Sequence, residues 1–97
     1  MELDKEFFDN IDILEKYKAN SDLKVFFDAI DKLEKLSGEI NDVIHESPLD
    51  RLILEKQAKE LTKKLEDKKD EIAMRTKTQK EYDAVYGCID YLENHFN

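Results

Sequence analysis

The sequence predicts an all-α fold with a single domain over residues 1–97, and two observations carry this prediction. Apolar residues recur at steps of three and four along most of the chain, which places them on one face of a helix. The chain has only two glycines and one proline, so the many tight turns of an all-β fold have few residues to build them. A charged fraction of 41% suits helices with one apolar stripe and a solvated remainder.

The first two helices are expected on either side of the polar break Asn20-Ser21-Asp22, in which Asn20 or Ser21 can cap the second helix. The first helix is expected from about Leu3 to Ala19, and the second from about Asp22 to His45. Gly38 lies inside the second helix, where glycine costs about 1 kcal/mol relative to alanine. It indicates either a close helix crossing or a mild bend.

The third helix is expected to begin at Pro48. Serine, here Ser47, is a favoured N-cap, and proline at the first helical position loses no hydrogen bond that the helix needs. The apolar stripe of this helix reaches Ile72 and is interrupted by Lys68. All six residues from Glu66 to Glu71 are charged, which indicates an exposed continuation of the helix or a fraying end.

The last connection is expected at Arg75–Thr78, before a fourth helix that runs to about Phe96. Thr78 and Glu81 fit the capping box, in which a threonine side chain and a glutamate three residues later satisfy free backbone N–H groups. The alternative is that the third and fourth helices are continuous.

The helix lengths predict a long central antiparallel hairpin with shorter N- and C-terminal helices near its open end. All nine aromatic residues lie outside residues 28–81, so the hairpin tip has aliphatic residues alone. An uncovered apolar patch usually marks a partner site, although a compact four-helix bundle would bury it. The predicted partner-binding residues are Ile40, Val43, Ile44, Leu49, Leu52 and Ile53.

The charge distribution argues against direct contact with nucleic acid. The formal net charge is −8, whereas nucleic-acid binders usually show a basic stripe. Residues 1–47 carry 13 acids and 6 bases, residues 48–80 carry 7 acids and 10 bases, and residues 81–97 carry 4 acids and no base. A mildly basic middle helix between acidic flanks indicates either charge complementarity between packed helices or a docking surface for a charged partner.

A cytoplasmic location with no membrane contact is the expectation for this chain. Cys88 is the only cysteine, so nothing supports an oxidising compartment. The acidic stretch at Met1–Asp4 does not resemble a signal peptide, and no apolar run approaches the ~20 residues that span a bilayer.

Catalytic, cofactor-binding and metal-binding motifs are not recognisable in the sequence, so we expect no enzyme, no cofactor and no metal site. His45 and His95 are each expected near a helix C-terminus, where a protonated imidazole favours the helix dipole. Cys88 lies beside Ile89, and a free cysteine in such a place usually behaves as a small buried hydrophobe.

Acidic residues at helical spacing leave one enzymatic alternative open. All-helical nucleotide pyrophosphatases hold Mg²⁺ with carboxylates spaced i, i+3, and such a site needs several of these pairs to converge on the bundle interior. The sequence has this spacing in Asp9/Asp12/Glu15 and in Asp28/Asp31/Glu34. Both sets flank the apolar stripe rather than lie in it, which favours a solvated face over a metal site.

The chain resembles the YlbF/YmcA family of small bacterial helical proteins between Ile11 and Phe96. The resemblance rests on the break before Val25-Phe26-Phe27, on a long helix that ends before Pro48, and on Tyr82 and Leu92 in the last helix. It implies a self-associating helical regulator that docks on other proteins, in RNA processing and developmental control for the best-known members. The cysteine-bearing tail of some members is missing, so an iron–sulfur role does not carry over.

The leading functional hypothesis is therefore a non-enzymatic regulator or adaptor that binds a protein partner and forms a homo-oligomer, with a dimer expected. The first alternative is a small acidic inhibitor, of phage origin for example, that blocks a nucleic-acid-processing enzyme. A Mg²⁺-dependent nucleotide pyrophosphatase is the remote alternative.

Overall fold

A computed structural model describes residues 3–18, 22–43 and 46–96 of the chain. The described residues form five helices and no strand: α1 (Lys5–Tyr17), α2 (Lys24–Val43), α3 (Pro48–Asp67), α4 (Lys69–Met74) and α5 (Gln79–Phe96). The all-α prediction is confirmed. The prediction of four helices is wrong, because the expected third helix is divided at Lys68.

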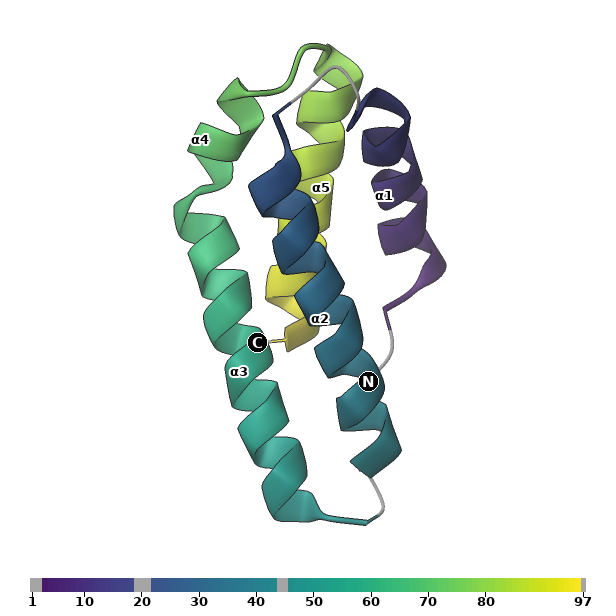
Figure 1. Ribbon diagram of the computed structural model, residues 1–97, viewed down its shortest axis with the longest axis vertical. Helices are drawn as coiled ribbons and strands as arrows, with labels where there is room; N and C mark the ends of the chain where they lie inside the picture. Colours follow the sequence, from purple (N-terminus) through teal and green to yellow (C-terminus); the bar gives the residue numbers. More distant parts are fainter. Residues whose placement is uncertain (1–2, 19–21, 44–45, 97) are drawn as a thin grey trace.

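The helices form an elongated bundle of 44 × 24 × 20 Å. In Figure 1, α2 descends, α3 and α4 return upward beside it, and α5 descends behind them. Close packing joins α2 to α3 and α1 to α5, and α5 also contacts α3 and α4. Because α1 and α5 stop short, only α2 and α3 reach the lower end of Figure 1.

The core is concentrated away from that lower end. Phe7, Phe26 and Phe96 are fully buried, as the clustering of aromatic residues in the sequence predicts. In α2 the last buried residue is Ile40, and in α3 the first is Ala58. The intervening turns of α3 have no fully covered side chain, so the core ends before the α2–α3 pair does.

Lys68 divides α3 from α4 within the charged run Glu66–Glu71. Its backbone leaves the helical region, with φ −103° and ψ 4°, and its N–H lies 3.2 Å from the carbonyl oxygens of both Lys64 and Leu65. Beyond the break, Ile72 and Ala73 are buried in the short helix that packs on α5. The charged run is therefore neither a straight continuation nor a frayed end.

Local start signals are found at the first turns of α1 and α3. Pro48 occupies the first turn of α3 and Ser47 its N-cap position, although the Ser47 hydroxyl makes no capping hydrogen bond. Asp4 caps α1, since its carboxylate accepts a hydrogen bond from the Phe7 N–H at 3.2 Å. The expected cap of the second helix at Asn20 or Ser21 lies outside the described residues.

The predicted break before α5 is confirmed, so the last helix is separate from α4. Thr78 Oγ1 accepts a hydrogen bond from the Glu81 N–H at 3.1 Å. The fully buried Glu81 carboxylate reaches back one residue further than a capping box requires, and accepts from the Lys77 N–H at 3.4 Å. This exchange fixes where α5 begins.

A search of the described helices for one that is long and apolar enough to cross a membrane finds none.

The capping box can be tested by replacing Thr78 with alanine. Loss of an N-cap side chain costs about 1 kcal/mol of stability. For a domain of this size that corresponds to a fall in Tm of about 4–8 °C. Thermal unfolding followed by circular dichroism measures the change. The control Thr78→Ser keeps the hydroxyl, and an equal loss of Tm in both variants would contradict the account.

Candidate functional site

The first turns of α3 carry the most prominent apolar surface among the described residues. Leu49, Leu52 and Ile53 have exposed fractions of 74%, 60% and 56%. These three residues, which we term the tip surface, lie within five consecutive positions. Large apolar side chains exposed singly need no explanation, but a cluster of this kind marks an interaction site.

The other predicted tip residues have different environments. Ile40 is completely buried in the core and is not available to a partner, so its place in the predicted site is wrong. At the position of Ile40, neighbouring helices still cover the apolar face of α2. Val43 is half-buried, and Ile44 lies outside the described residues.

Polarity is inverted along the first turns of α3. Arg51 and Glu55 form an ion pair, with Nε and Oε1 2.8 Å apart, and their side chains are only 37% and 20% exposed. The leucines on the opposite side of the same turns are more exposed than this charged pair. In a helix that meets only its own core and water, the apolar side chains take the sheltered side, as Leu54 does here, but Leu49, Leu52 and Ile53 do not.

A hollow of about 320 Å³ lies beside the tip surface, between α2 and α3. Val43, Ile53 and Leu54 supply its apolar lining, and the carboxylates of Glu39 and Asp50 lie at the same place. The tip therefore combines projecting leucines with an adjoining concave surface.

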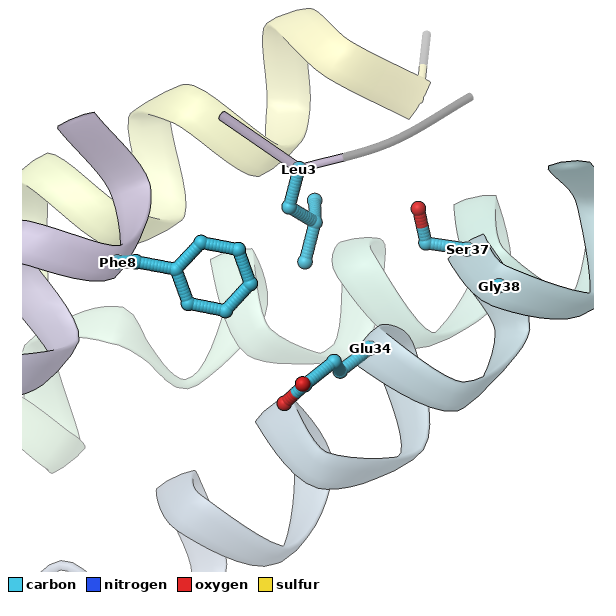
Figure 2. Close-up of a pocket in the computed structure, with 5 residues that line it drawn as sticks. All are labelled: Leu3, Phe8, Glu34, Ser37 and Gly38. Carbon is cyan, nitrogen blue, oxygen red and sulfur yellow. The ribbon is translucent and has the colours of Figure 1, made fainter. Parts of the chain in front are cut away.

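A second hollow, also of about 320 Å³, lies between the start of α1 and the middle of α2. Figure 2 shows Leu3 and Phe8 reaching into it from the α1 side, opposite Glu34 and Ser37 of α2. Phe8 is 36% exposed although it neighbours the fully buried Phe7. This hollow was not predicted, because α1 and α2 are adjacent here through side chains rather than through closely packed backbones.

Gly38 lines the second hollow and is the one signal in the sequence that could have located it. A Cβ atom built at Gly38 would meet nothing within 4 Å. Of the two alternatives left open for this glycine, a close helix crossing is therefore excluded. The mid-helix glycine leaves open space on the surface instead of accommodating a neighbouring helix.

Replacing Gly38 with alanine tests this description of the hollow. Because the new methyl group meets no atom and alanine favours the helix, unfolding free energy should rise by about 1 kcal/mol. Urea unfolding measures this rise. Gly87 provides the contrast, since a Cβ there would lie 3.0 Å from Asn10 Nδ2, and Gly87→Ala should gain less or destabilise. Equal effects at the two glycines would contradict the packing described here.

The acidic sets at helical spacing do not converge. The one group of described carboxylates close enough to share a metal ion is Glu66, Asp90 and Glu93, whose oxygens lie within 4.8 Å of one another. None of the residues in the sets Asp9/Asp12/Glu15 and Asp28/Asp31/Glu34 belongs to it. The sequence offered no sign of this group, since its members come from α3 and α5 and meet only through tertiary packing.

Lys69 already supplies a positive charge to this carboxylate group. Its Nζ lies 2.9 Å from Glu66 Oε1 and 3.8 Å from Asp90 Oδ1. Loss of solvent around Glu93 and the nearby Glu66 carboxylate raise the pKa of Glu93 above its ordinary value. The group is thus a surface ion-pair network in which two carboxylates repel each other.

Replacing Glu93 with glutamine should stabilise the protein at pH 7. A raised folded-state pKa means that the native state binds this proton more tightly, so the wild type loses stability as pH rises above the ordinary value of 4.5. Glutamine does not titrate, so the variant does not lose this stability. The difference in Tm between variant and wild type should disappear below pH 4.5. Thermal unfolding across pH measures it. Asp9→Asn removes an exposed carboxylate of α1 as a control, and the same pH-dependent gain in both variants would contradict the assignment.

The remaining reactive side chains are sheltered. Cys88 is fully buried, and burial raises the pKa of its thiol to about 12. Burial also lowers the pKa of His95, whose Nδ1 lies 3.3 Å from the Tyr91 hydroxyl. His45 lies outside the described residues. A thiol of this kind is a poor nucleophile at neutral pH, as expected for a buried structural cysteine.

Comparison of the chain with known proteins finds no match among protein-family models, curated proteins or solved structures. The resemblance to the YlbF/YmcA family stays a prediction from the sequence.

Proposed function

We propose that this chain is a non-enzymatic adaptor or regulator, which binds proteins, including further copies of itself, through the tip surface. In this proposal α2 and α3 act as an antiparallel hairpin that carries Leu49, Leu52 and Ile53 away from the core. A cytoplasmic location belongs to the same proposal and is supported by the single, buried, unpaired cysteine.

The observation that carries the proposal is the inverted polarity of the first turns of α3. The tip leucines face water while Arg51 and Glu55 take the more sheltered side. Burial of one leucine or isoleucine side chain is worth about 1.5–3 kcal/mol. Three such side chains in one small area therefore offer a substantial driving force for association, even after the cost of immobilising a partner.

Self-association is the form of binding that we propose first. The expected regulator of the YlbF/YmcA type also acts as an oligomer, which agrees with this proposal without testing it. The hollow lined by Val43, Ile53 and Leu54 supports a contact with shape complementarity, since a side chain of the partner can enter beside the projecting leucines.

The test is the solution mass of the wild type and of the double variant Leu49→Glu/Leu52→Glu, measured by light scattering after size-exclusion chromatography. The wild type should exceed the chain mass of 11.5 kDa at least twofold at high concentration, and the variant should be monomeric. Because both side chains are exposed, helicity and Tm should barely change.

The matched control places the same two charges on exposed apolar side chains away from the tip. Val25 and Met74 have exposed fractions of 51% and 84%. Val25→Glu/Met74→Glu should keep the wild-type mass. A wild type that stays monomeric throughout, or a tip variant that assembles as well as the wild type, would overturn the proposed function. Unfolding of the tip variant alone would show that the leucines belong to the core.

A further inference from the structure

The exposed face of α3 changes character along its length. The tip surface occupies its first turns. The same face continues at helical spacing with three exposed lysines, Lys56, Lys59 and Lys63. Glu60 is interleaved with these lysines, so the stretch from Lys56 to Lys63 carries three bases against one acid on this face. Lys59 and Lys63 also share a hollow with Glu66, Asp67 and Glu93, which leaves Lys56 as the lysine next to the tip without a carboxylate in that hollow. No ion pair engages the three lysines within the described part of the chain. The face therefore presents an apolar end and a basic continuation.

The walls of the hollow between α1 and α2 have the complementary character. Phe8, Asp12 and Glu15 share one side of α1 by their spacing of four and seven positions. Asp31, Glu34 and Gly38 share one side of α2 in the same way. Phe8, Glu34 and Gly38 line the hollow itself, so its apolar floor is continued by carboxylates on both walls.

These carboxylates are free to meet a partner. Asp12, Glu15, Asp31 and Glu34 form no ion pair among the described residues and contribute to no metal-sized cluster. The acidic spacing that suggested a nucleotide-hydrolysing site thus puts Glu34 in the lining of the hollow and the other three carboxylates on the helix sides that lead away from it. Such a surface favours a basic, apolar occupant and repels nucleic acid.

We propose that the exposed face of α3 in one copy docks into the α1–α2 hollow of a second copy. This inference rests on the proposed function and names the surface that receives the tip. A leucine of the tip enters beside Phe8 and Gly38, and the lysines one and two turns further along lie against the acidic walls. An apolar cavity of about 150 Å³ holds a benzene ring, so a hollow of about 320 Å³ has room for an aliphatic side chain.

Charge favours this arrangement over a parallel contact of two α3 faces. Side-by-side α3 faces in the same direction would bring the lysines of both copies together, which costs affinity. Docking on the hollow pairs them with carboxylates instead. The two contacting surfaces are different, so the assembly closes as a two-fold dimer where the contact is made in both directions, and continues into a ring or an open chain of copies where it is made in one.

The experiment uses one variant for each half of the contact and then mixes them. Leu49→Glu/Leu52→Glu removes the docking face, and Gly38→Met fills the hollow with a side chain whose Cβ meets no atom of its own chain. Light scattering should find each variant monomeric alone. An equimolar mixture should form a one-to-one dimer of twice 11.5 kDa that grows no further, because each partner keeps one intact half.

Charge and placement have their own controls. Glu34→Lys should weaken association at least tenfold. Asp83→Lys on α5 makes the same charge change away from the hollow and should leave the strength of association unaltered. Asn94→Met adds a methionine at an exposed position of α5 and should assemble like the wild type.

Each remaining outcome overturns the inference. If Gly38→Met assembles like the wild type while the tip variant is monomeric, the tips contact each other, and the proposed function stands without this inference. A mixture of the two monomeric variants that stays monomeric excludes docking of the tip in the hollow. A wild type that is monomeric at every concentration overturns both proposals.

Discussion

The structure depends on where its apolar core ends. Ile40 and Ala58 are the last well-covered positions toward the lower end of α2 and α3, and the helices that could cover the turns beyond them stop earlier. The ten residues from Pro48 to Gln57 continue as a helix because their backbone hydrogen bonds are local and a favourable proline starts them. Apart from the half-buried Leu54, which packs against the core, their large apolar side chains face water.

The distribution of charge is a consequence of the same arrangement. Acidic residues border the hollow between α1 and α2, and lysines line the exposed side of α3. Both surfaces point away from the core, and neither neutralises the other within one chain. Packing of α1 on α5 and of α2 on α3 leaves the two acidic walls apart from the basic helix. The attraction between copies that we propose rests on that separation.

Local signals in the sequence were sufficient for most of the fold. Pro48 and the Thr78–Glu81 pair determine helix starts through hydrogen bonds made within a few residues, so they could be read without a structure. The aromatic residues identified the core end for a similar reason, since large apolar side chains at helical spacing must be covered. The apolar tip that holds Leu49, Leu52 and Ile53 was predicted from its aliphatic composition, but its exposure depends on how far the terminal helices reach, which composition does not determine.

Features that depend on contacts between distant residues could not be read in this way. The break at Lys68 lets Ile72 and Ala73 meet α5, and no local signal places α5 beside them. Ile40 looks like a tip residue in sequence, yet neighbouring helices still cover it. Gly38 was recognised as unusual, but the sequence alone does not distinguish a glycine at a close helix crossing from a glycine beside an open hollow. The Glu66–Asp90–Glu93 group unites two helices that are far apart along the chain.

The most direct test of the account is amide hydrogen exchange measured in dilute and in concentrated solution. The account predicts that amides in the first turns of α3 exchange rapidly in dilute solution and become protected as concentration rises, while those of the buried part of α5 stay equally protected throughout. Protection of the first turns of α3 that is the same at every concentration would contradict the central claim, because the tip would then be covered by its own chain or by nothing.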